Sequence, residues 1–113
     1  SILNRLYENG EDIDKQTIIR IVENTINEQE DAFINYCKSL SNNQAALVVA
    51  IAKEKGVAPA LSQQFIRTYS LPAASSVSLA LKALRKRDFV YDFNGKIIVY
   101  DRFFSIWLRR ETE

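Results

Sequence analysis

Asn94 and Gly95 restrict the possible folds of this chain more than any other pair of residues. Both residue types tolerate the positive φ angles that a type I′ turn needs at its two central positions. The segments on either side, residues 89–93 and 96–100, are rich in aromatic and β-branched side chains, which are typical of strands. The sequence therefore predicts a tight antiparallel β-hairpin here.

Three helices are predicted before this hairpin. A capping-box pattern over residues 41–44 predicts the start of the first helix, which ends at Gly56. Ser62 predicts the N-cap of a short second helix. A longer third helix follows the turn at residues 70–72 and ends near Arg87, and its spacing predicts a buried side of Val77, Ala80, Leu81 and Leu84.

Three helices followed by a hairpin are the element order of a winged helix-turn-helix, in which the hairpin is the wing. We therefore expect a mainly α fold over residues 40–113, with a three-helix core and an antiparallel β-hairpin wing. After the wing, Asp101 predicts the N-cap of a last helix, with Trp107 locking that helix across the winged helix. We expect its core side to hold Phe103, Phe104, Trp107 and Leu108, and its other side to hold Arg102, Ser105 and Arg109.

Residues 1–39 are predicted to form a small helical segment ahead of this domain. Residues 2–8 read as the end of a helix that Gly10 closes. Asp14 predicts the N-cap of a second helix, whose apolar face comprises Ile18, Ile21, Val22 and Ile26. A third helix is expected from about Glu30 to Ser39, unless it and the second are one bent helix, and it should bury Phe33, Cys37 and Leu40.

The sequence lacks the residue types that many catalytic and metal sites use. It has no histidine, which excludes a Ser-His-Asp triad, a Cys-His pair and any His-ligated metal. Its one cysteine excludes a Cys-rich zinc site, and its three glycines each mark a turn, so no glycine-rich loop can hold phosphate. We expect that this chain is not an enzyme and holds no cofactor and no metal.

Three further features of the sequence indicate what kind of protein and which compartment the domain belongs to. No Met occurs, even at position 1, which leads us to expect a processed chain or, in preference, a domain from a longer protein. The single Cys37 fits a reducing compartment, so we expect a cytoplasmic protein. No apolar run approaches the roughly 18 residues that span a bilayer, so we expect no membrane partner.

Charge is distributed unevenly along the chain. Residues 1–40 hold 4 basic and 8 acidic side chains, whereas residues 41–113 hold 11 basic and 6 acidic ones. A basic part joined to an acidic part suggests two surfaces with different partners. The third helix of a winged helix usually enters the major groove of duplex DNA, where small residues permit close approach and Lys or Arg pair with phosphates. The candidate DNA contacts are Ser75, Ser76, Ser78, Lys82, Arg85 and Lys86 on this helix, Lys96 on the wing and Arg67 on the preceding helix.

The third helix is also open to two other interpretations. Cations near a helix C-terminus are favoured by the helix dipole, which explains the cluster at residues 82–87 without any ligand. Leu79 falls in the middle of the expected DNA face, and an apolar side chain there suits a protein contact better than a thymine methyl group. No Asn or Gln lies on this helix to read adenine. Leu79 is therefore the candidate protein contact, and DNA, protein and solvent all stay open for this face.

Several stretches carry a resemblance to a known family: LSNNQAALVVAIAKEKG, FIRTYSLPAASSVSLALKAL, the hairpin, and VYDRFFSIWLRR. They resemble the C-terminal winged-helix module of archaeal-type P-loop ATPases of the AAA+ and STAND-like group, and residues 75–77 and 101–108 are the most specific. The resemblance covers nearly the whole chain. It implies that residues 1–39 are the end of the ATPase lid, and that the ATP-binding motifs lie upstream and fall on none of these residues.

We therefore predict a regulatory winged-helix domain at the C-terminal end of a larger ATPase, in contact with duplex DNA through its third helix and wing. The alternative is a protein-interaction domain that docks on the upstream ATPase core of its own chain, or on another partner, without nucleic acid.

Overall fold

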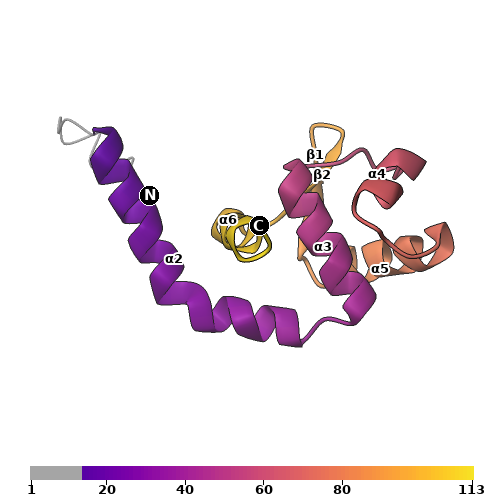
Figure 1. Ribbon diagram of the computed structural model, residues 1–113, viewed down its shortest axis with the longest axis horizontal. Coiled ribbons are helices and arrows are strands. Elements are labelled where there is room, and N and C mark those ends of the chain that lie inside the picture. The colour runs from indigo at the N-terminus through magenta and orange to yellow at the C-terminus, as the bar shows by residue number, and fades with distance from the viewer. Residues whose placement is uncertain (1–13) are drawn as a thin grey trace.

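The computed structural model describes residues 14–113, which form five helices and one hairpin. In chain order these are α2 (Lys15–Lys38), α3 (Asn42–Glu54), α4 (Gln63–Thr68), α5 (Ala74–Lys86), β1 (Val90–Phe93), β2 (Lys96–Val99) and α6 (Arg102–Glu111) (Figure 1). The predicted mainly α fold with a three-helix core and a wing is confirmed. The predicted helix end at residues 2–8 and its Gly10 lie outside the described residues.

Four helices begin at the capping residues that the sequence predicts. Side-chain oxygens of Asp14, Ser41 and Ser62 each accept the backbone N–H three residues on, and the Gln44 side chain completes the capping box of α3. The Asp101 carboxylate accepts two backbone N–H groups of α6. Each cap satisfies N–H groups that the first helical turn leaves unpaired, so the local sequence sets where these helices begin.

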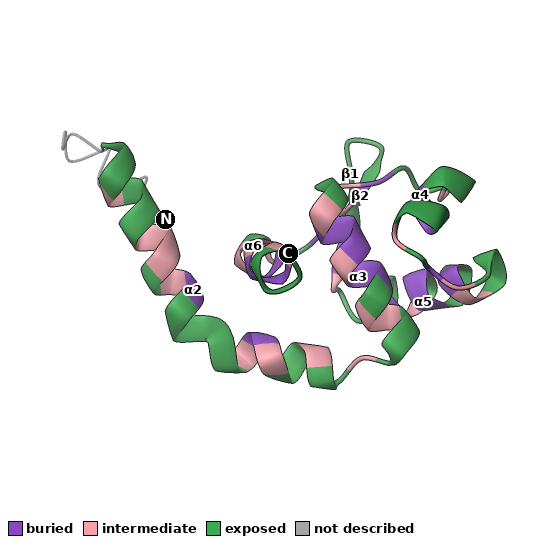
Figure 2. Ribbon diagram, in the orientation of Figure 1, coloured by how far each residue is buried: buried purple, intermediate pink, exposed green. Residues whose placement is uncertain are grey.

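α3 is the central helix of the core. α5 packs against one side of it and α6 against the other, and α6 also lies against α2 (Figure 1). The side chains predicted to point inward from α3, those of Leu47, Val48 and Ile51, are fully buried. Figure 2 shows that buried residues concentrate on α3, α6 and one face of α5, whereas most of α4 and α2 faces solvent.

Residues 15–38 form one bent helix, which is the second of the two predicted alternatives (Figure 1). Residues 26–30 contain no Gly or Pro that would end a helix part-way. The predicted apolar face of its first half is only partly covered, because Ile26 is buried but Val22 is half-buried and Ile18 is 37% exposed.

Phe33 fastens the second half of α2 to α6. Its fully buried ring lies 5.4 Å from the ring of Phe104 and 5.7 Å from that of Trp107, measured between centroids. The indole N–H of Trp107 donates to Glu30 at 3.0 Å. These contacts add to the predicted role of Trp107: it is buried in the common core and also ties α6 to α2.

Several side chains differ from their predicted burial, among them Phe103, which is half-buried rather than buried. Cys37 is only half-buried, and desolvation raises the pKa of its thiol. Leu40, beyond the end of α2, is also half-buried. Ser105, expected on the exposed side of α6, is 7% exposed, because it lies under Arg109, whose Nη1 donates to Ser105 Oγ at 3.0 Å.

The hairpin has the predicted type I′ turn, with φ of 52° at Asn94 and 78° at Gly95. The two strands pair in antiparallel register. Val57, just after α3, adds a short bridge: its N–H donates to Ile97 O at 3.0 Å, and the Ile97 N–H donates to Val57 O at 2.7 Å. This bridge, which the sequence did not predict, fixes the wing to the end of α3.

None of the helices described over residues 14–113 is both long enough and apolar enough to cross a membrane. Over the same residues, no group of three or more His, Cys, Asp or Glu side chains could hold a metal ion. Several carboxylates instead have local structural roles, as Asp14 and Asp101 do in capping helices and Asp92 does in an ion pair.

Replacing Gly95 by Val should destabilise the domain by about 1–3 kcal/mol, because a β-branched residue is strained at positive φ. An added Cβ at Gly95 would meet nothing within 4 Å, so the loss would come from backbone strain and not from a clash. Gly95→Asn is the matched control and should lose less, because Asn tolerates this conformation. Urea unfolding measures both, and an unchanged Gly95→Val midpoint would show that the turn is not type I′.

Replacing Phe33 by Ala should destabilise the domain by about 3–5 kcal/mol, because it empties a fully buried site between α2 and α6. Ile19→Ala on the same helix is the control: Ile19 is 42% exposed, and its loss should stay within about 0.5 kcal/mol. Thermal unfolding of the two variants measures the difference. Equal, small losses would contradict the packing of α2 described above.

Candidate nucleic-acid interface

α5 presents its predicted DNA face to solvent. The buried stripe is the predicted one, with no member more than 6% exposed: Val77, Ala80, Leu81 and Leu84. Because a helix places its two faces on opposite sides, this burial directs the other side chains outward. Ser75, Ser78, Lys82 and Lys86 are exposed, and Ser76 is half-buried at the edge of the face.

Arg85 joins α5 to the wing. Its guanidinium lies 3.0 Å from the carboxylate of Asp92 on β1. The two side chains are 41% and 60% exposed, so the pair is expected to contribute only about 0–1 kcal/mol. The predicted phosphate contact of Arg85 would have to share or replace this pair.

Arg87 is exposed, but contacts with other residues of the domain hold its side chain. It donates to the backbone and hydroxyl oxygens of Ser39 at 3.0 and 2.8 Å, and its guanidinium lies 5.0 Å from the centre of the Phe89 ring. These contacts tie the end of α5 to the end of α2. Lys82 and Lys86 are then the α5 cations that form no ion pair within the part of the chain that the structure describes.

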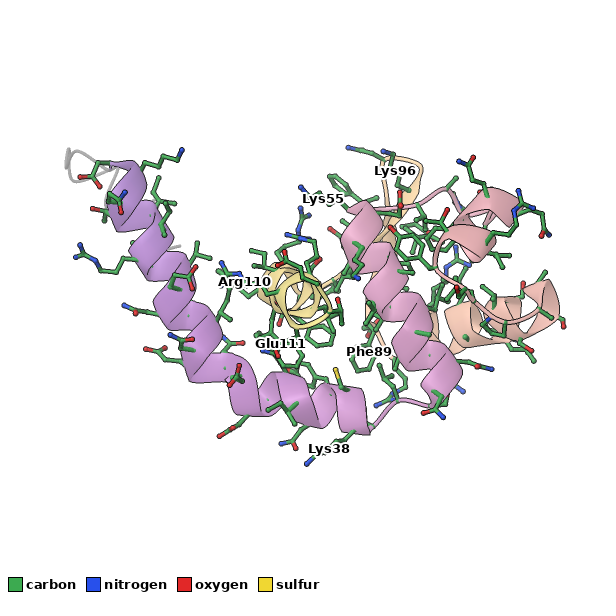
Figure 3. All side chains as sticks on the ribbon, in the orientation of Figure 1. Lys38, Lys55, Phe89, Lys96, Arg110 and Glu111 are labelled. Atoms are coloured by element: carbon green, nitrogen blue, oxygen red, sulfur yellow. The ribbon has the colours of Figure 1, made fainter. Side chains whose placement is uncertain are left out.

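Lys96 and Arg67, the two candidates outside α5, are both exposed. Figure 3 shows Lys96 at the turn end of the hairpin, near Lys55 at the C-terminal end of α3. The side-chain stem of Lys96 runs along Gly56, with its Cδ 3.6 Å from where a Cβ of Gly56 would stand. The turn end of the wing therefore lies near Lys55, a further cation that was not among the predicted contacts.

A longer charge pattern unites these cations. Residues 55–87, which include all of α4 and α5, contain no Asp and no Glu but six Lys or Arg side chains. The sequence holds this signal, but the signal extends over two helices and their loops and is not visible in α5 alone. Glu23 and Glu30 of α2 instead bond to Arg110 and Trp107 of α6, on the other side of α3. The helix-turn-helix is thus cationic without acidic side chains of its own.

Apolar side chains interrupt this cationic surface. Leu79 is 70% exposed on α5. On the wing, the rings of Tyr91, Phe93 and Tyr100 are 36%, 50% and 61% exposed and lie in a row, with Tyr91 5.3 Å from Tyr100 and 6.1 Å from Phe93. The alternation of side chains along β1 was the available signal for this row, which the sequence analysis missed. Exposed aromatic groups of this kind favour contact with another molecule.

Tyr69 positions α4. Its hydroxyl donates to the carboxylate of Glu54 on α3, and this hydrogen bond is the main reason that the pKa of Tyr69 rises to about 12. The phenol therefore stays neutral and bonded at physiological pH. Glu54 is the residue just before the acid-free stretch, and its carboxylate accepts this hydrogen bond from within the domain.

Comparison with known families identifies the kind of domain. A family model described as a probable winged helix domain matches residues 31–110. The match begins in the second half of α2, near Phe33, and ends in α6. No curated protein and no solved structure shows significant similarity to the chain.

Proposed function

The chain belongs to the family of probable winged helix domains, and from that premise we propose that it binds duplex DNA through α5 and the wing. The observation that carries the proposal is the acid-free stretch of residues 55–87, which makes the helix-turn-helix cationic throughout. Duplex DNA is the partner that such a surface fits, because its phosphates attract Lys and Arg independently of base sequence.

The side chains of α5 favour contact with the DNA backbone over base recognition. Ser75 and Ser78, at its N-terminal end, are small enough to let the helix approach a groove closely. Lys82 and Lys86, one and two turns further on, can reach phosphates on the groove edge. Because α5 carries no Asn or Gln, we propose binding with little sequence preference.

We further propose that the domain regulates a larger AAA+ or STAND-like ATPase, as the resemblance of its sequence implies. Residues 1–39 would then be the end of the ATPase lid. The chain itself would carry no catalytic group and bind no cofactor. A glycine-rich phosphate loop encoded upstream would support this setting, and its absence would remove it.

A protein-interaction domain is the second candidate, with the ATPase core of the same chain or another protein as partner. The observation in its favour is the exposed apolar surface: Leu79 on α5 and the three aromatic rings on the wing. Aromatic side chains are enriched in protein interfaces, and interfaces often depend on a few such anchors.

Salt dependence tests the DNA proposal. About four phosphate contacts, from Lys82, Arg85, Lys86 and Lys96, imply a slope of about −3 to −4 for log affinity against log salt. Replacing Lys82 and Lys86 by Ala should flatten this slope by about two units. Lys15→Ala with Lys38→Ala, both on exposed positions of α2, is the matched control and should leave it unchanged.

Fluorescence anisotropy with a labelled duplex measures each slope. Non-specific binders have dissociation constants of about 10⁻⁴–10⁻⁶ M at physiological salt, so binding should be visible at tens of micromolar protein in about 50 mM salt. If the duplex does not bind there, the DNA proposal fails and the protein-docking candidate replaces it.

Leu79→Glu separates the two candidates when it is compared with Leu79→Gln, which has a similar size and no charge. On a DNA surface the added carboxylate should weaken duplex binding well beyond the Gln variant at low salt, and the difference should shrink as salt rises. A surface built around an apolar anchor would lose its protein partner in both variants, with little dependence on salt. Equal duplex affinity for Glu and Gln at low salt would place Leu79 away from DNA.

A further inference from the structure

A cavity of about 250 Å³ opens between the C-terminal end of α3, strand β2 and α6. Three cations line it, one from the end of α3 and two from α6: Lys55, Arg102 and Arg109. Gly56 and Ser105 also line it, and the described residues around it include no carboxylate. Lys55 and Gly56 begin the acid-free stretch, whereas Arg102, Ser105 and Arg109 belong to α6, outside the DNA surface proposed above.

Arg109 is held in position by the fold. Its Nη1 donates to the carbonyl oxygen of Ala52 at 3.2 Å and to Ser105 Oγ at 3.0 Å. Ser105 is the one polar side chain that is buried among the described residues, and it serves as a support for this guanidinium. A guanidinium has five N–H donors, and these two bonds use only those of one nitrogen.

The hydrogen bond to the Ala52 carbonyl gives Arg109 a structural role at the C-terminal end of α3. Within the described part of the chain, Lys55 and Arg102 have no such role through their side chains. Backbone N–H groups of Lys55 and Gly56 already donate to the last carbonyls of α3. The side chains of Lys55 and Arg102 are exposed and form neither an ion pair nor a hydrogen bond within residues 14–113. Three like charges around one cavity repel one another, and an anion in the cavity would relieve that repulsion.

We propose that this cavity binds a phosphate group through Lys55, Arg102 and Arg109. Phosphate suits the site better than a carboxylate, because its larger negative charge matches three cations and its oxygens accept paired N–H groups of Arg. The cavity is below the roughly 300–1,000 Å³ of drug-sized ligand pockets, so it holds a phosphate group and not a whole nucleotide. The phosphate comes either from a free or small phosphorylated molecule or from a nucleic-acid strand.

The α6 side of the site and α5 lie on opposite sides of α3 (Figure 1), but the site adjoins the proposed DNA surface at Lys96 of the wing. A second strand, or a duplex that bends past the turn of the wing, would reach it by way of Lys96, which runs beside Gly56. A small phosphorylated molecule would instead occupy it without any contact to α5.

Titration of the 113-residue chain with inorganic phosphate, followed by NMR, tests the site. Phosphate should shift the Nε–H signals of Arg102 and Arg109 and the amide of Ser105 in a saturable way, and sodium chloride at equal ionic strength should not. Arg102→Gln and Lys55→Gln should each weaken phosphate binding about tenfold, the effect of losing one charge-assisted hydrogen bond. Arg110→Gln is the matched control, because Arg110 adjoins Arg109 but its guanidinium pairs with Glu23.

The same variants identify the source of the phosphate. If Arg102→Gln weakens duplex binding as much as it weakens binding of inorganic phosphate, the strand supplies the group. If duplex affinity is unchanged while phosphate binding falls, the ligand is a free or small phosphorylated molecule. Shifts that grow linearly and match those in chloride, or saturable shifts that survive both substitutions, would overturn the site. That failure leaves the DNA proposal intact, because the salt test of the DNA proposal uses Lys82 and Lys86, which do not line the cavity.

Discussion

Burial of one face of α5 against α3 is the interaction on which the rest of the surface depends. Val77, Ala80, Leu81 and Leu84 are almost wholly removed from water, and burial of each Val or Leu side chain contributes about 1.5–3 kcal/mol. The helix cannot rotate to present another face without exposing this stripe. Lys82 and Lys86 therefore point to solvent as a consequence of core packing, whatever partner they meet.

The wing and the long α2 are attached to this core by contacts between distant segments. The Val57–Ile97 bridge fixes the hairpin to the end of α3, and the Arg85–Asp92 pair links it to α5. On the other side of α3, Phe33 and the Trp107–Glu30 hydrogen bond join α6 to α2. Glu23 and Glu30 of α2 thus bond to α6, on the other side of α3 from α5.

Local features of the sequence predicted most of the fold. The four caps, the buried stripe of α5 and the Asn94–Gly95 turn each depend on neighbouring residues, and all were confirmed. What the sequence left out depends on contacts between residues far apart in the chain. Helix periodicity placed the Ser105 hydroxyl outside, and only the packing of α6 against α3, which brings Arg109 to the Ala52 carbonyl, buries it. The helical pattern was enough to predict which candidate DNA contacts of α5 are exposed. The ion pair between Arg85 and Asp92 became visible only in the tertiary structure.

The central claim, that α5 and the wing together face DNA, is tested most directly by mapping where a duplex contacts the domain. Backbone amide signals of the ¹⁵N-labelled chain would be followed by NMR as an unlabelled duplex is added at low salt. The account predicts that the largest shifts fall on residues 74–86 and on the hairpin turn, with α2 nearly unchanged. Shifts confined to α2, or none at protein concentrations where duplex binding should saturate, would contradict it.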